Sequence, residues 1–112
     1  KINMQGWTQQ LASNKFNKQL DADNIDLGAV KYTIIMTKYD EIVTPYTSGY
    51  LRKPGVTNIV IQDVCKQDYT DHLSFSYDNN AFQIALNVLR GVAPTKNIKC
   101  EFFPQCSQRC FV

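Results

Sequence analysis

The sequence predicts a mixed α/β fold: two parallel strands with helices, stapled by disulfide bonds, forming part of a sheet rather than a complete one. Two apolar, β-branched runs are each followed by a polar loop, and an amphipathic helix follows the second loop. Four cysteines occur in a chain of 112 residues. A chain of this length can bury one small core, so we expect residues 1–112 to be a single segment, a partial α/β domain.

Residues 1–29 are expected to form a helical lead-in. Apolar residues recur at roughly helical spacing between positions 7 and 20, and Ser13 is available to cap a short second helix. The polar stretch at positions 21–24 then ends the helix. The amino end lacks an initiator Met and a signal-peptide pattern, so we expect that a signal sequence, alone or with further protein, was removed.

Residues 30–91 are expected to carry the sheet and the main helix. The run VKYTIIMT at positions 30–37 predicts a strand covered on both faces. The run VTNIVIQDV at positions 56–64 predicts a second strand, after a loop punctuated by Pro and Gly. Both strands end in polar loops, which is the arrangement of an α/β sheet.

A helix is predicted after the second loop, capped by Asp78 or Asn79 and ended by Arg90 and Gly91. Four apolar residues at helical spacing predict its buried stripe. They are Phe82, Ala85, Leu86 and Leu89. Residues 92–112 follow as a Cys-rich tail.

The cysteines indicate disulfide bonds and an oxidising, extracellular compartment, because their number is even and the short chain has no C-x-x-C pair. Four cysteines allow three pairings, and the residues alone leave the pairing open. A zinc site made of all four is the alternative. The cysteines are Cys65, Cys100, Cys106 and Cys110.

Composition argues against several partners. An apolar fraction of 44% favours a packed core over disorder. Twelve Lys and Arg against ten Asp and Glu give a net charge of +2 without a basic stripe, so we expect no nucleic-acid partner. No apolar run approaches the length of a membrane span, so we expect no integral membrane span.

Asp40 and His72 are the candidate catalytic residues. Asp40 lies just after the first predicted strand, and His72, the one histidine of the chain, lies shortly after the second. Functional groups of α/β sheets gather at the carboxyl ends of the strands, so we expect these side chains to meet as an acid–base pair. The simpler alternative is a turn-forming aspartate and a surface histidine.

Three motifs in this order carry a family resemblance. They are TKYDEIVTPYTSGYL, GVTNIVIQDVC, and DHLSFSYD followed by a helix. Residues 32–89 thereby resemble the carboxy-terminal region of secreted bacterial triacylglycerol lipases and esterases of the α/β-hydrolase superfamily. They are more distantly similar to the fungal lipase B type. The resemblance implies the carboxy-terminal portion of an α/β-hydrolase sheet, hydrolysis of lipid or small ester substrates in lipid catabolism, and no cofactor or metal.

The resemblance also implies roles for individual residues. Asp40 matches the acid and His72 the base of a Ser–His–Asp triad, and their order along the chain agrees with that of α/β-hydrolases. Ile42 and Val43 match residues that line the acyl pocket in the fungal type.

The cysteines take part in the same resemblance. Cys65 and Cys100 match cysteines that pair in the relatives, which leaves Cys106 and Cys110 to pair by exclusion.

The chain departs from the family in lacking the nucleophile elbow G-x-S-x-G. None of its five serines has glycine two residues before and two after it, and the oxyanion hole is missing as well. We expect both elements upstream of Lys1 and no activity of the chain alone. The alternative is a non-catalytic, secreted, disulfide-stapled binding protein derived from a lipase. Its recognition residues would be Lys38, Tyr39, Tyr46 and Tyr50.

Overall fold

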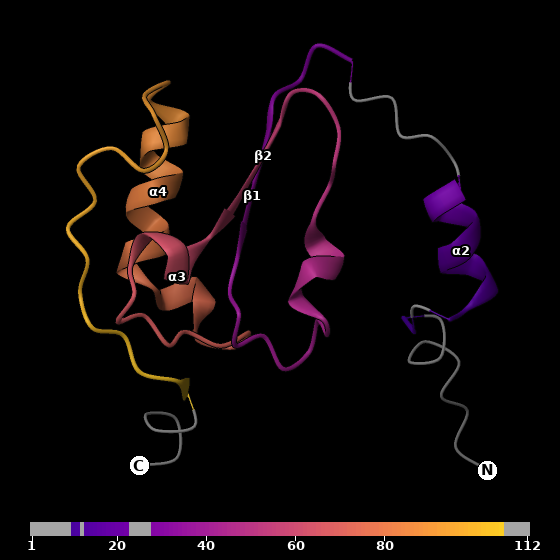
Figure 1. Cartoon of the computed structure of the whole chain (residues 1–112), viewed down its shortest axis with the longest axis horizontal. Helices are drawn as coiled ribbons and strands as arrows, with labels where there is room; N and C mark the ends of the chain where they lie inside the picture. Colours follow the sequence, from indigo (N-terminus) through magenta and orange to yellow (C-terminus); the bar gives the residue numbers. More distant parts are fainter. Residues whose placement is uncertain (1–9, 12, 23–27, 107–112) are drawn as a thin grey trace. The chain divides into compact units, whose positions relative to one another are not determined.

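The computed structural model describes residues 10–11, 13–22 and 28–106, which fall into two compact units, Lys1–Val30 and Lys31–Val112 (Figure 1). The first unit contains the helix α2, Lys15–Ala22. Its cap is Asn14 rather than the expected Ser13, because the Asn14 side-chain oxygen accepts a hydrogen bond from the Phe16 N–H at 2.9 Å. Much of the earlier part of the expected lead-in falls on residues 1–9 and 12, outside the described residues.

The second unit is built on the two predicted parallel strands, which the structure confirms. β1 is Tyr32–Met36 and β2 is Val56–Val60, paired in register from Tyr32 opposite Val56 to Met36 opposite Val60. Within the described residues the sheet has these two strands alone, so the other edge of β1 has no paired strand there. The 3₁₀ turn η1, Tyr46–Gly49, packs on β1, and Gly49 lies close to the Met36 side chain.

The second predicted strand is shorter than expected. β2 stops at Val60, and Ile61–Val64 form the helical turn α3, closed by a hydrogen bond from the Cys65 N–H to the Ile61 carbonyl at 2.8 Å. Ile61 and Gln62 are both buried, so this turn folds over the end of the sheet instead of extending it. An apolar run reads as strand by its pattern alone, and the tertiary contacts of α3 override that preference.

The main helix begins and ends where the sequence predicts. α4 is Asn79–Leu89, and the Asp78 side chain caps it by accepting a hydrogen bond from the Asn80 N–H at 2.8 Å. Gly91 follows the helix with φ +70°, a left-handed conformation that favours glycine. A second 3₁₀ turn, η2 at Phe75–Tyr77, precedes it. None of the described helices is long and apolar enough to cross a membrane.

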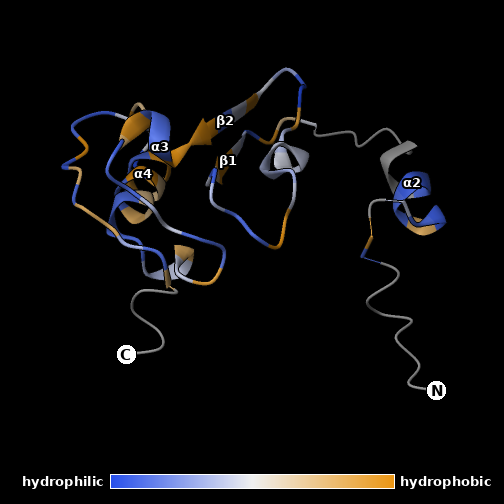
Figure 2. Ribbon diagram, turned by 60° about the horizontal axis from the view of Figure 1, so that its bottom comes forward, coloured by the Kyte–Doolittle hydropathy of each residue, from blue (hydrophilic) through white to orange (hydrophobic). Residues whose placement is uncertain are grey.

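The buried face of α4 differs from the predicted stripe. Ala81 and Ile84 pack with Ile59 and Ile61 as the core, whereas Phe82 is 59% exposed and Leu89 is 83% exposed. The other two residues of the predicted stripe, Ala85 and Leu86, are half-buried. The helix is apolar on more than one face, so spacing alone did not select the face that meets the sheet. Figure 2 shows hydrophobic residues along α4 and at the end of β2.

The carboxy-terminal tail is fastened to the rest of this unit. The disulfide Cys65–Cys100 forms as the resemblance implied, with a sequence separation of 35, and a pair of cysteines so bonded does not ligate zinc. Cys106 is not a free thiol either, and its expected partner Cys110 lies outside the described residues. The buried side chain of Asn80 adds two hydrogen bonds to the Glu101 backbone, at 2.8 and 2.9 Å.

Candidate functional site

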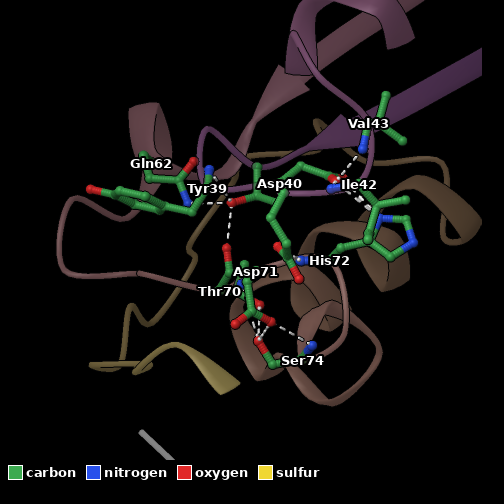
Figure 3. A network of polar contacts seen from close by, with 11 residues as sticks. Tyr39, Asp40, Ile42, Val43, Gln62, Thr70, Asp71, His72 and Ser74 are labelled. Atoms are coloured by element: carbon green, nitrogen blue, oxygen red, sulfur yellow. Dashed lines mark hydrogen bonds and ion pairs between the residues drawn. The ribbon is translucent and has the colours of Figure 1, made fainter. Parts of the chain in front are cut away.

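The chain segments that follow β1 and α3 meet at the carboxyl edge of the sheet. Tyr39 and Asp71 form an isolated parallel bridge beyond the strands, which places the segment after β1 beside the histidine loop. The buried side chain of Gln62 forms hydrogen bonds with both of these segments (Figure 3). Its carbonyl oxygen accepts from the Lys38 N–H at 2.9 Å, and its amide donates to the Asp68 carbonyl at 3.2 Å. These contacts set where the two loops begin.

Thr37 is the second polar residue buried at this junction. Its hydroxyl donates to the Thr70 carbonyl at 2.5 Å and accepts from the Gln62 amide at 2.9 Å. The sequence predicted a site role for neither Thr37 nor Gln62. Their positions near the ends of the two apolar runs could have indicated this role, because a polar side chain that is buried there needs a hydrogen-bond partner.

Asp40 and His72, the predicted acid and base, are in direct contact. The His72 Nδ1 lies 3.1 Å from Asp40 Oδ1 and 3.0 Å from Oδ2. A carboxylate accepts hydrogen bonds, so the proton belongs on Nδ1 and the neutral ring presents Nε2 as a proton acceptor. Within the described part of the chain, Nε2 has no hydrogen-bond partner, and the His72 side chain is 41% exposed.

Asp40 is held as a carboxylate. Its Oδ1 accepts from the backbone N–H groups of Ile42 and Val43, at 2.9 and 2.7 Å, and only 16% of the side chain is exposed. Burial on its own raises the pKa of Asp40, but the hydrogen bonds from Val43, His72 and Ile42 outweigh it, and the pKa lies below its ordinary value. Asp40 therefore remains a negatively charged acceptor for the imidazole at neutral pH.

Two further carboxylates position the histidine loop. The Glu41 side chain accepts from the His72 backbone N–H at 3.1 Å. The buried Asp71 accepts from the N–H and hydroxyl of Ser74, at 2.9 and 2.7 Å, and from the Cys106 N–H at 2.6 Å. Burial raises the pKa of Asp71, but these hydrogen bonds outweigh it and lower the pKa below its ordinary value. Neither acid was predicted from the sequence, although each is next in the chain to a predicted site residue.

A largely apolar cleft of about 260 Å³ opens beside the pair, with Asp40 and His72 in its wall. Val43, one of the two residues expected to line an acyl pocket, is part of this wall, whereas Ile42 is exposed and outside it. The other lining residues come from β1, the residue that follows it, η1 and η2. They are Ile34, Ile35, Met36, Thr37, Tyr46, Gly49 and Phe75. The cleft offers apolar surface next to an acid–base pair.

No family model matches this chain, and no curated protein matches it in sequence. The resemblance to lipases and esterases therefore rests on the three motifs and stays a prediction. What the described residues establish independently is an Asp–His pair at the carboxyl edge of two parallel strands, beside an apolar cleft.

The site as described contains a base but no nucleophile bonded to it. Among residues 10–11, 13–22 and 28–106, no serine, threonine or cysteine hydrogen-bonds to the His72 ring. Ser74, the nearest serine in sequence, is engaged by Asp71 instead. The described residues also contain no group of three or more His, Cys, Asp or Glu side chains placed to hold a metal ion.

Proposed function

We propose that this chain supplies the acid and the base of a serine-type carboxylic-ester hydrolase that acts on lipid or other small esters. The observation that carries the proposal is the contact of the His72 Nδ1 with both oxygens of Asp40, at 3.1 and 3.0 Å. An imidazole oriented in this way by a carboxylate is the general base of acyl-transfer triads. The apolar cleft beside it suits the acyl chain of an ester.

The proposed chemistry follows from this orientation. The His72 Nε2 takes the proton of a serine hydroxyl as that oxygen attacks the ester carbonyl, and His72 then gives the proton to the departing alcohol. Water releases the acyl group in the second half of the reaction, with the same nitrogen as base. Asp40 holds the ring tautomer and stabilises the imidazolium throughout; its lowered pKa keeps it ionised for that role.

The serine and the oxyanion hole are proposed to come from protein outside these residues, in an α/β-hydrolase sheet of which β1 and β2 are two strands. The open edge of β1 supports this part of the proposal. Parallel sheets are ordinarily wide and covered on both faces, and an unpaired strand edge favours the addition of another strand. Tyr32, at the start of β1, is an exposed aromatic residue on that strand.

We further propose that the protein works outside the cell. The disulfide Cys65–Cys100 and the absence of a free thiol among the described cysteines support an oxidising compartment.

The decisive experiment uses the protein extended by the coding sequence upstream of Lys1. We expect hydrolysis of p-nitrophenyl butyrate, loss of activity by a factor of about 10⁴ in Asp40→Asn, and a loss at least as large in His72→Ala. The matched control is Asp63→Asn, an exposed aspartate that pairs with Lys38 at the surface, and it should retain full activity. Esterase activity that survives His72→Ala would refute the proposal, as would an upstream sequence that holds a signal peptide alone.

A binding function is the second candidate, and one observation favours it. Three exposed aromatic rings stand in a row beside the site: Tyr39 and Tyr69 have centroids 5.4 Å apart, and Tyr69 and Phe102 6.0 Å apart. Exposed aromatic surface of this kind is typical of recognition sites. This candidate gains if the 112 residues alone unfold cooperatively as a monomer and the longer protein hydrolyses no ester.

A further inference from the structure

Asp68 and Asp78 are two buried aspartates at the ends of the loop that carries His72. Asp68 is 0% exposed and Asp78 is 2% exposed, so both carboxyl groups are removed from water. We propose that the two groups share one proton and thereby form a latch that closes the histidine loop. Release of that proton to solvent leaves two carboxylates in the same buried site and opens the latch. The latch belongs to the loop itself and does not depend on whether the chain acts on esters.

The hydrogen bonds assign the proton to Asp78. Asp68 accepts from the Thr70 N–H at 2.9 Å through Oδ1 and from the Asn80 side-chain amide at 2.7 Å through Oδ2, so both of its oxygens already have donors. Asp78 accepts from the Asn80 N–H through Oδ1, whereas its Oδ2 is buried without a hydrogen-bond partner. An ionised Asp78 would leave that oxygen unsatisfied next to a second negative charge. A protonated Asp78 can donate from Oδ2 to the Asp68 carboxylate.

Among the described residues, no positively charged side chain faces the two aspartates to compensate a second negative charge. On α4 itself, the neighbouring donors are the Asn80 and Ala81 N–H groups. From the loop, the facing charged group is Asp68; from the tail, Asn80 is met by the backbone of Glu101, whose side chain is exposed. No described Lys or Arg forms an ion pair with either aspartate. The surroundings of the pair therefore accommodate one negative charge, which lies on Asp68, while Asp78 carries the proton.

The raised pKa of Asp78 agrees with this geometry. Burial, followed by the charge of Asp68 and the hydrogen bond with it, raises the pKa of Asp78 to about 7. A carboxyl whose pKa is raised by folding stabilises the folded state fully below its unfolded pKa of about 4. That stabilisation is lost as the pH rises through the folded value of about 7. The latch is accordingly closed in mild acid and open above neutral pH.

A bound cation is the competing way to satisfy two buried carboxylates, and the contacts disfavour it. Both oxygens of Asp68 and one of Asp78 are occupied by N–H donors, which leaves a single carboxylate oxygen for a metal. Calcium takes six to eight oxygen ligands. The proton resides on the one free oxygen of Asp78, and Asp68 can accept it because a carboxylate oxygen that already has one donor keeps a second lone pair.

The test follows the carboxyl carbons of the full chain by NMR between pH 4 and 9, together with thermal unfolding between pH 5 and 8. We expect one aspartate to titrate near pH 7 and the unfolding midpoint to fall by about 5–10 °C over this range. Asp78→Asn, which carries a permanent donor, should remove the pH dependence of the midpoint. Asp63→Asn, at an exposed aspartate, should preserve it.

The wild-type titration keeps the test decisive even if Asp78→Asn does not fold. Aspartates that all titrate below about pH 5 would overturn the proposal. So would an unfolding midpoint at pH 8 that rises on addition of Ca²⁺ while Asp78 stays ionised, because a cation would then be the partner. Asp68→Asn provides a second variant: it removes the neighbouring charge, so the remaining aspartate should titrate at lower pH than in the wild type.

Discussion

Replacement of Gln62 by alanine should separate the two loops that bring Asp40 and His72 together. The side chain is buried and bonds both loops, through the Lys38 N–H at 2.9 Å and the Asp68 carbonyl at 3.2 Å. Alanine leaves both backbone groups without these partners. A buried polar group without a partner costs about 1–3 kcal/mol, so the free energy of unfolding should fall by roughly 2–5 kcal/mol.

Urea denaturation at 25 °C measures this loss directly. With a slope of about 1 kcal/mol per molar urea, as suits a small domain, the midpoint should fall by at least about 2 M. Gln67→Ala is the matched control, since that glutamine is exposed and its side chain donates one hydrogen bond, to the Cys100 carbonyl at 3.3 Å. It should change the free energy of unfolding by less than about 0.5 kcal/mol. Equal effects of the two substitutions would refute the assignment of Gln62 as the link between the loops.

Three further predictions test the residues that support the site. Replacing Cys65 and Cys100 together by alanine should cost about 3–4 kcal/mol in urea unfolding, because the disulfide closes a separation of 35 residues; a loss under 1 kcal/mol would contradict this. By the same measurement, Ile84→Ala should lower the free energy of unfolding by about 2–5 kcal/mol, because Ile84 is fully buried. Leu89→Ala should lower it by less than about 0.5 kcal/mol, because Leu89 is exposed. The reverse order would contradict the assignment of the Ile84 face of α4 to the core. Asp71 has a lowered pKa, so its ionised form stabilises the fold above about pH 4, and this stabilisation is lost as the pH falls. Asp71→Asn should therefore make the free energy of unfolding depend less on pH in the acid range. An unchanged dependence in the acid range would contradict this role of Asp71.

The sequence predicted the elements whose signals are local. The parallel strands follow from two β-branched runs, and both ends of α4 follow from Asp78 as the cap and Gly91 after the last turn. The meeting of Asp40 with His72 followed from a rule of sheet geometry, since the loops after parallel strands share one edge.

Other features depend on contacts that no local pattern contains. The run that ends in Ile61 suits a strand or a buried helical turn, and packing decides for the turn. α4 is apolar at Phe82 as well as at Ile84, so its inner face depends on where the sheet lies. The role of Gln62 depends on two backbone groups, one of them 24 residues away in sequence, and no spacing rule reaches that far.

The loop between Asp40 and β2 is anchored at its start by Asp40 and near its end by Asn58, whose side chain bonds the N–H and the carbonyl of Leu51. Asp40 binds the N–H groups of Ile42 and Val43, and the acid–base pair is held by residues of the bridge and of α3 rather than by the remainder of that loop. Yet this remainder contributes Tyr46 and Gly49 to the wall of the cleft. Evolution can therefore alter the size and shape of the cleft through this loop, including its length, while the proton-transfer geometry stays intact. The fold in this way separates the part that can diversify from the part that must not move.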